Sequence, residues 1–140
     1  MRTLTTNSPE LRSFLKYVAL FLLALNGIGA FIGSIPMMLD PSGTTSNIQL
    51  RYLEYTPFAD FLIPGIVLFV CNGLLSVFVF IALAFNWRFH GWLVFLQGMV
   101  LTIWIIVQVI MLRDFNFLQV AFGLIGIALM ILGHYLSRFR

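Results

Sequence analysis

Charge is nearly absent from most of this chain. Its 140 residues include only eight Lys and Arg and five Asp and Glu, and every one of these falls outside four uncharged stretches. The stretches are Tyr17–Leu39, Phe61–Trp87, Phe89–Leu112 and Phe115–Ser137. Because 61% of the residues are apolar, too few polar side chains remain to cover a water-soluble domain. The composition therefore excludes an ordinary soluble protein.

Reactive and metal-binding residues are also scarce. The single cysteine, Cys71, has no partner for a disulfide or for Cys-x-x-Cys redox chemistry. The two histidines, His90 and His134, are isolated from other metal-binding residues, so we predict no metal site. No nucleophile, base or metal set converges anywhere in the sequence. We therefore predict no catalytic residue, no cofactor and no enzymatic activity.

The four uncharged stretches have the length of membrane spans. Each has at least 23 residues and reaches about 35 Å as a helix, against a hydrocarbon core of about 30 Å. We place the spans at approximately 15–38, 58–86, 90–112 and 115–137, in one domain covering 1–140. The last two connections are only a few residues long, so neighbouring helices must be antiparallel. The sequence predicts an all-helical, up-down-up-down bundle of four transmembrane helices.

The basic residues lie mainly on one predicted side of the membrane. Six fall on the side of the two termini, and two fall on the other side. The six are Arg2, Arg12, Lys16, Arg88, Arg138 and Arg140, and the two are Arg51 and Arg113. This asymmetry predicts cytoplasmic N- and C-termini. Since the net charge of +3 is not clustered into a patch, we expect no nucleic-acid partner.

The connection between the first two spans contains the clearest turn signals. Asp40-Pro41-Ser42-Gly43 is typical of a turn that ends the first helix. The mixed apolar and polar segment 44–56 favours a short element lying on the outer membrane surface. Pro64-Gly65 is expected to weaken or kink the start of the second span. Asp60 has two interpretations: it binds a cation or water at the kink, or it stabilises the start of the helix.

Small and amide residues inside the spans mark the faces that should pack together. Small residues let helix backbones approach, and amides need hydrogen-bond partners in lipid. Asn26 and Gln97 lie at similar depths, which predicts a hydrogen bond between them with Asn72 about a turn away. Gly29 and Gly33 form a Gly-x-x-x-Gly pattern, which serves contact either between subunits or within one chain. The predicted packing residues are Asn26, Gly29, Gly33, Asn72, Gln97, Gly123, Gly126 and Gly133.

A second group of polar residues approaches one level near the outer surface. Asp60, Gln108, Gln119 and Arg113 are predicted to form a polar layer there. This layer is either a vestibule that binds a ligand or simply the solvated end of the bundle.

Two segments of the first half resemble a known group of proteins. The run Asp40–Gly43, followed by Thr56–Phe69 and Asn72-Gly73, resembles small four-span bacterial integral membrane proteins. Those proteins carry a D-P-S-G turn and a P-F-x-D-[FY]-x-I-P-G segment and have no assigned activity. The resemblance implies a multi-pass protein of the bacterial cytoplasmic (inner) membrane and supplies no catalytic residues.

Three classes of function remain open from the sequence. The first is a non-enzymatic accessory or scaffold bundle that packs against lipid, a larger membrane protein or a second copy of itself. The second is a small oligomeric transporter or ion-permeating protein with a polar vestibule around Asp60. The lack of a charged residue in mid-membrane weighs against this second class. The third is an enzyme, for which we find no residues.

Overall fold

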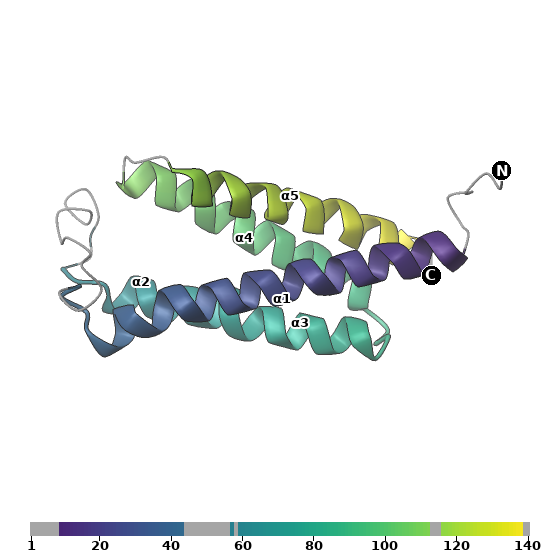
Figure 1. Ribbon diagram of the computed structural model, residues 1–140, viewed down its shortest axis with the longest axis horizontal. Coiled ribbons are helices and arrows are strands. Elements are labelled where there is room, and N and C mark those ends of the chain that lie inside the picture. Colours follow the sequence, from purple (N-terminus) through teal and green to yellow (C-terminus); the bar gives the residue numbers. More distant parts are fainter. Residues whose placement is uncertain (1–8, 44–56, 58, 113–115, 139–140) are drawn as a thin grey trace.

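The computed structural model describes residues 9–43, 57, 59–112 and 116–138. In that part of the chain every regular element is a helix, and four helical stretches are long and apolar enough to cross a membrane. Figure 1 shows them packed side by side. The predicted four-helix fold is confirmed. The predicted surface element at 44–56 lies outside the described residues.

Helix α1, Pro9–Leu39, is the longest. It begins with a proline at its first position, where no backbone N–H is needed, and Glu10 lies near the positive end of the helix dipole. It ends at the predicted turn, where the N–H of Gly43 donates to the carbonyl oxygen of Asp40 at 3.0 Å. Gly43 has a φ of 77°, which glycine adopts at little cost.

The second span consists of three consecutive helices: α2 (Leu62–Val67), a π-helical segment η2 (Leu68–Leu74) and α3 (Leu75–Ala84). At the end of η2, the N–H of Leu75 donates to the carbonyl oxygen five residues earlier, that of Val70. Gly65 has a packing role as well: a Cβ there would lie 2.8 Å from Cβ of Met37 in α1. The departure from regular α-helix is the π-helical segment, which begins three residues after Gly65. Gly65 itself allows α1 and α2 to approach each other closely.

The last two spans are α4 (His90–Leu112) and α5 (Phe117–Arg138). The turn before α4 contains Asn86, whose φ is 52°. Asparagine tolerates this left-handed conformation better than most residues. The start of α5 has reciprocal bonds: the N–H of Gln119 donates to Oδ1 of Asn116, and the N–H of Asn116 donates to Oε1 of Gln119. This capping box satisfies N–H groups that the helix leaves free.

Helices α4 and α5 pack closely along four glycines, Gly91 and Gly98 from α4 and Gly126 and Gly133 from α5. A Cβ at Gly98 would lie 2.6 Å from the backbone nitrogen of Met130 on the facing helix. A Cβ at Gly133 would lie 2.6 Å from Cα of Phe95. Each helix contributes its two glycines seven residues apart, so they recur on one face. We call this contact the glycine seam.

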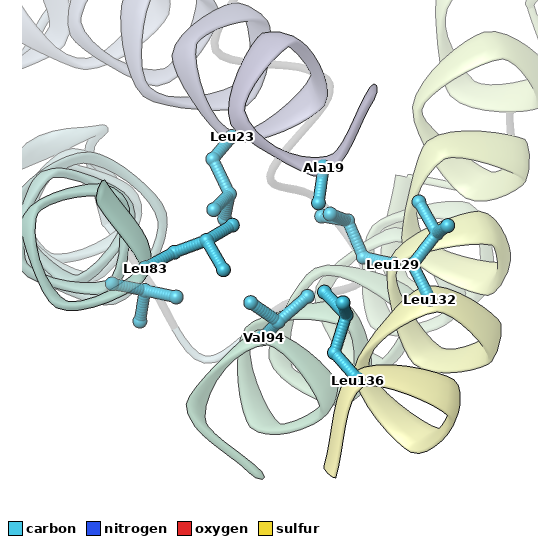
Figure 2. Packing of buried hydrophobic residues seen from close by; sticks show 8 residues of the cluster. Ala19, Leu23, Leu83, Val94, Leu129, Leu132 and Leu136 are labelled. Carbon is cyan, nitrogen blue, oxygen red and sulfur yellow. The ribbon is translucent and has the colours of Figure 1, made fainter. Parts of the chain in front are cut away.

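The main apolar core occupies only one half of the bundle. Figure 2 shows side chains from α1, α3, α4 and α5 pointing toward one another. The buried cluster consists of Ala19, Leu23, Val79, Leu83, Val94, Leu129, Leu132 and Leu136. All of these lie toward the end where α1 begins and α5 ends, which we call the termini end (Figure 1). The opposite end, where α1 ends and α5 begins, is the loop end.

Candidate functional site

A partly open pocket of about 200 Å³ lies in the half of the bundle nearer the loop end. Its walls come from α1, η2, α4 and the start of α5. The lining residues are Asn26, Gly29, Ala30, Leu68, Leu101, Trp104, Ile105, Gln108, Asn116, Leu118, Gln119 and Phe122. Asn116 and Leu118 are exposed, so the pocket reaches the surface at the loop end. We call it the loop-end pocket.

The pocket exists because α1 presents small residues on this face. Gly29 and Ala30 contribute almost no side chain, whereas Leu23 fills the same interhelical space in the core. The ring of Phe122 partly covers the gap, since a Cβ at Gly29 would lie 2.8 Å from its Cζ. The sequence therefore leaves open space between α1 and the α4–α5 pair at this level.

The pocket has apolar walls and amides at both ends. Leu68, Leu101 and Ile105 form part of the apolar wall. Gln108, Asn116 and Gln119 contribute polar groups toward the loop end, and Asn26 does so toward the middle of the bundle. No lining residue carries a charge. The pocket is thus suited to an uncharged, mainly apolar guest with a polar part.

A layer of buried amides separates the pocket from the apolar core. Nδ2 of Asn26 donates to Oγ of Ser76 at 2.8 Å. Nε2 of Gln97 donates to Oδ1 of Asn72 and to the carbonyl oxygen of Cys71, each at 3.4 Å. The partners differ from those that depth alone predicts, because Asn26 bonds to Ser76 and not to Gln97. The layer links α1 to α3 and η2 to α4.

Three buried polar atoms in this region have no hydrogen-bond partner among the described residues. They are Oγ of Ser34, Nδ2 of Asn72 and Oε1 of Gln97. A serine hydroxyl can rotate toward a nearby helix carbonyl, so Ser34 is the simplest to satisfy. The two amide atoms are held by side chains that already share one hydrogen bond. Burial without a partner is costly for such groups, so this pair is an exception that needs a cause.

Among the described residues of the predicted outer polar layer, two line the loop-end pocket and one does not. Gln108 and Gln119 both line the loop-end pocket, together with Asn116. Asp60 is not among the lining residues; its Oδ1 accepts a hydrogen bond from the N–H of Leu62 at 3.0 Å. This bond is the one expected if Asp60 stabilises the start of the helix. Arg113 lies outside the described residues.

The glycines of the first span contact other helices of the same chain. Gly29 lies against Phe122 of α5, and a Cβ at Gly33 would lie 3.4 Å from Cδ2 of Leu68 in η2. The Gly-x-x-x-Gly pattern therefore has a use within one chain. In α5, Gly126 and Gly133 lie on the glycine seam, whereas a Cβ at Gly123 would meet only Cγ2 of Ile105, at 3.8 Å.

Sequence reasoning missed Gly91 and Gly98, the α4 half of the glycine seam. Their seven-residue spacing, repeated by Gly126 and Gly133, was the signal that could have found them. Ser34 was missed as well, because a single serine in a glycine-rich helix carries no pattern. No group of three or more His, Cys, Asp or Glu residues that could hold a metal ion occurs among the described residues.

Fold and composition together define a multi-pass membrane protein built as a four-helix bundle. Comparison of the chain with models of protein families, with curated proteins and with solved structures found no match.

Proposed function

We propose that this chain is a non-enzymatic lipid-binding membrane protein that holds part of one lipid acyl chain in its loop-end pocket. The pocket itself carries the proposal: it is apolar along its walls, uncharged and open at one end of the bundle. A cavity of about 150 Å³ suffices for benzene, so 200 Å³ accommodates a short segment of hydrocarbon chain. A whole helix, about 10 Å across, does not fit.

The polar residues of the pocket suit the arrangement of a lipid. The loop end is expected at one membrane surface, where the ester and glycerol groups of a lipid lie. Gln108, Asn116 and Gln119 are at that end of the pocket, and the apolar wall extends from there toward mid-membrane. A lipid entering from the surface would place its chain along the wall and its polar part near the amides.

The location of the protein in a membrane is part of the same proposal. The resemblance to bacterial four-span proteins and the distribution of basic residues support the bacterial cytoplasmic membrane, with both termini in the cytoplasm. An accessory role beside a larger membrane protein, or as a homo-oligomer, is compatible with lipid binding. The exposed apolar faces of the four helices supply surface for such contacts.

The closed half of the bundle favours binding over conduction. Between the amide layer and the termini end, the eight buried apolar residues of the core fill the space between the helices, and the buried His90 at that end is hydrogen-bonded through Nδ1 to the carbonyl oxygen of Trp87. A permeation path usually needs ionisable residues facing it. The polar side chains that line the pocket are four amides and the indole of Trp104, none of which is ionisable, and this favours binding of a guest over its passage across the membrane.

The experiment is native mass spectrometry of the chain purified from the membrane in mild detergent. We expect one retained lipid per chain. Ile105→Trp, which adds a bulky ring to the pocket wall, should lose this lipid. Ile103→Trp is the matched control, because Ile103 lies on the same helix, is exposed and does not line the pocket. Equal lipid retention by both variants, or none by the unaltered chain, would contradict the proposal.

A further inference from the structure

Two amide side chains at the centre of the bundle each leave one atom without a partner. Asn72 of η2 and Gln97 of α4 are both 0% exposed. Their shared bond, from Nε2 of Gln97 to Oδ1 of Asn72, is 3.4 Å long, against a usual N–H···O distance of about 2.9 Å. Among the described residues nothing pairs with Nδ2 of Asn72, a donor, or with Oε1 of Gln97, an acceptor.

The neighbours of the two amides select one orientation for them. Exchanging the oxygen and nitrogen of Gln97 would set its Oε1 against the carbonyl oxygen of Cys71, which accepts from Nε2 at 3.4 Å. Exchanging those of Asn72 alone would bring its Nδ2 against Nε2 of Gln97. In the one arrangement that keeps both bonds, Nδ2 of Asn72 lacks an acceptor and Oε1 of Gln97 lacks a donor among the described residues.

The neighbouring pair in the same layer shows the contrast. Nδ2 of Asn26 reaches Oγ of Ser76 at 2.8 Å, a normal length. The long bonds of Gln97 both go to η2, the segment in which the backbone widens to a π-helix. π-Helical turns occur often at functional sites. The loose, incompletely bonded pair thus coincides with the irregular part of the second span.

Only certain groups satisfy both free atoms. A hydroxyl accepts from Nδ2 of Asn72 and donates to Oε1 of Gln97. A ketone, ester or ether accepts only, so it leaves Gln97 unpaired. A carboxylate or an ammonium would be charged, and no charged residue among the described ones lies in this layer to compensate it.

We propose that the Asn72–Gln97 pair is a binding site for one hydroxyl group, supplied by water or by an alcohol with an apolar chain. Leu68 and Leu101 line the loop-end pocket and stand four residues, about one helical turn, from Asn72 and Gln97 respectively. The alcohol source therefore rests on the proposed function, because its chain would occupy that pocket. The water source does not depend on it.

The test is nuclear magnetic resonance of the full chain in micelles of a phosphocholine detergent, which has no hydroxyl group. The side-chain amide signals of Asn72 and Gln97 are followed while 1-octanol or octyl methyl ether is added. The two probes share an apolar chain, but only the alcohol donates. Cross-relaxation between water and the amide protons of Asn72 is measured before either is added.

For an alcohol, we expect saturable shifts with an affinity for 1-octanol roughly tenfold or more above that for the ether. Gln97→Met removes the acceptor and should bring the ratio of affinities close to one. Ile103→Met places the same side chain at an exposed position of the same helix outside the pocket, and should leave the ratio unchanged. For water, Asn72 shows cross-relaxation with a long-lived water in the unaltered chain, and octanol causes no saturable shift.

Other results overturn the inference. Equal affinity for octanol and ether shows that the pocket takes an apolar chain without recognising a hydroxyl, which leaves the proposed function intact. A preference for octanol that persists in Gln97→Met shows that another residue recognises the hydroxyl. Absence of both water contact and saturable binding removes the hydroxyl site altogether.

Discussion

Replacing Gly133 with alanine adds one methyl group at the centre of the glycine seam. That methyl carbon would lie 2.6 Å from Cα of Phe95 on α4, and closer still to the backbone nitrogen of the same residue. Carbon atoms pack without strain at about 3.5 to 4.0 Å, so α4 and α5 must separate by about 1 Å. Both close neighbours are backbone atoms, which a side-chain rotation does not move.

The same substitution at Gly123 serves as the control. A Cβ there would meet only Cγ2 of Ile105, at 3.8 Å, so the methyl group fits in place. Alanine is favoured over glycine in a helix by up to about 1 kcal/mol, and this gain applies at both positions. It cancels when the two variants are compared. The remaining difference is the overpacking cost, about 1–3 kcal/mol, by which Gly133→Ala should be less stable than Gly123→Ala.

Reversible unfolding in mixed micelles, followed by circular dichroism as a denaturing detergent is titrated in, measures this difference. The free energy of unfolding of Gly123→Ala should equal or exceed that of the unaltered chain. Gly133→Ala should fall below both. Equal stability of the two variants would refute the close approach of α4 and α5 at Gly133.

Three further predictions concern other parts of the bundle. Asn26→Leu and Ser76→Ala should show a coupling energy of about 0.6 kcal/mol in a double-mutant cycle, because they remove the same hydrogen bond; a value near zero would contradict the pairing. Asn116→Ala should destabilise the chain by about 0.5–2 kcal/mol and speed exchange of the backbone N–H of residue 119, because the Oδ1 that accepts from this N–H is lost; unchanged exchange would contradict the capping box. Reconstituted liposomes should show no ion flux above that of empty liposomes, and a flux that Asp60→Asn alters would favour the transporter alternative.

The overall architecture follows from the sequence because membrane spans have a strong physical signature. Residues 17–39 could be recognised from their length and lack of charge alone, since a shorter or charged segment does not cross a bilayer. The turn at Asp40–Gly43 could also be recognised from the sequence, because proline fixes one backbone dihedral angle and glycine permits a left-handed one. Both features depend on neighbouring residues in the chain.

The contacts between helices depend on how each helix is rotated, and depth along a helix does not determine rotation. Asn26 bonds to Ser76 and Gln97 bonds to Asn72, two positions about one helical turn apart on the second span. The π-helical segment is also invisible to hydropathy, since it changes the hydrogen-bond pattern and not the composition. The loop-end pocket depends on helix rotation and on the π-helical segment. It forms where Gly29 and Ala30 of α1 face the ring of Phe122, and η2 supplies part of its wall.

The central claim is that the loop-end pocket holds a lipid chain, and an experimental structure in a lipid nanodisc tests it most directly. We predict elongated density along the wall formed by Leu68, Leu101 and Ile105, ending near Gln108 at the loop end. A pocket closed by movement of α1 against Phe122, or filled by a helix of another protein, would contradict the account.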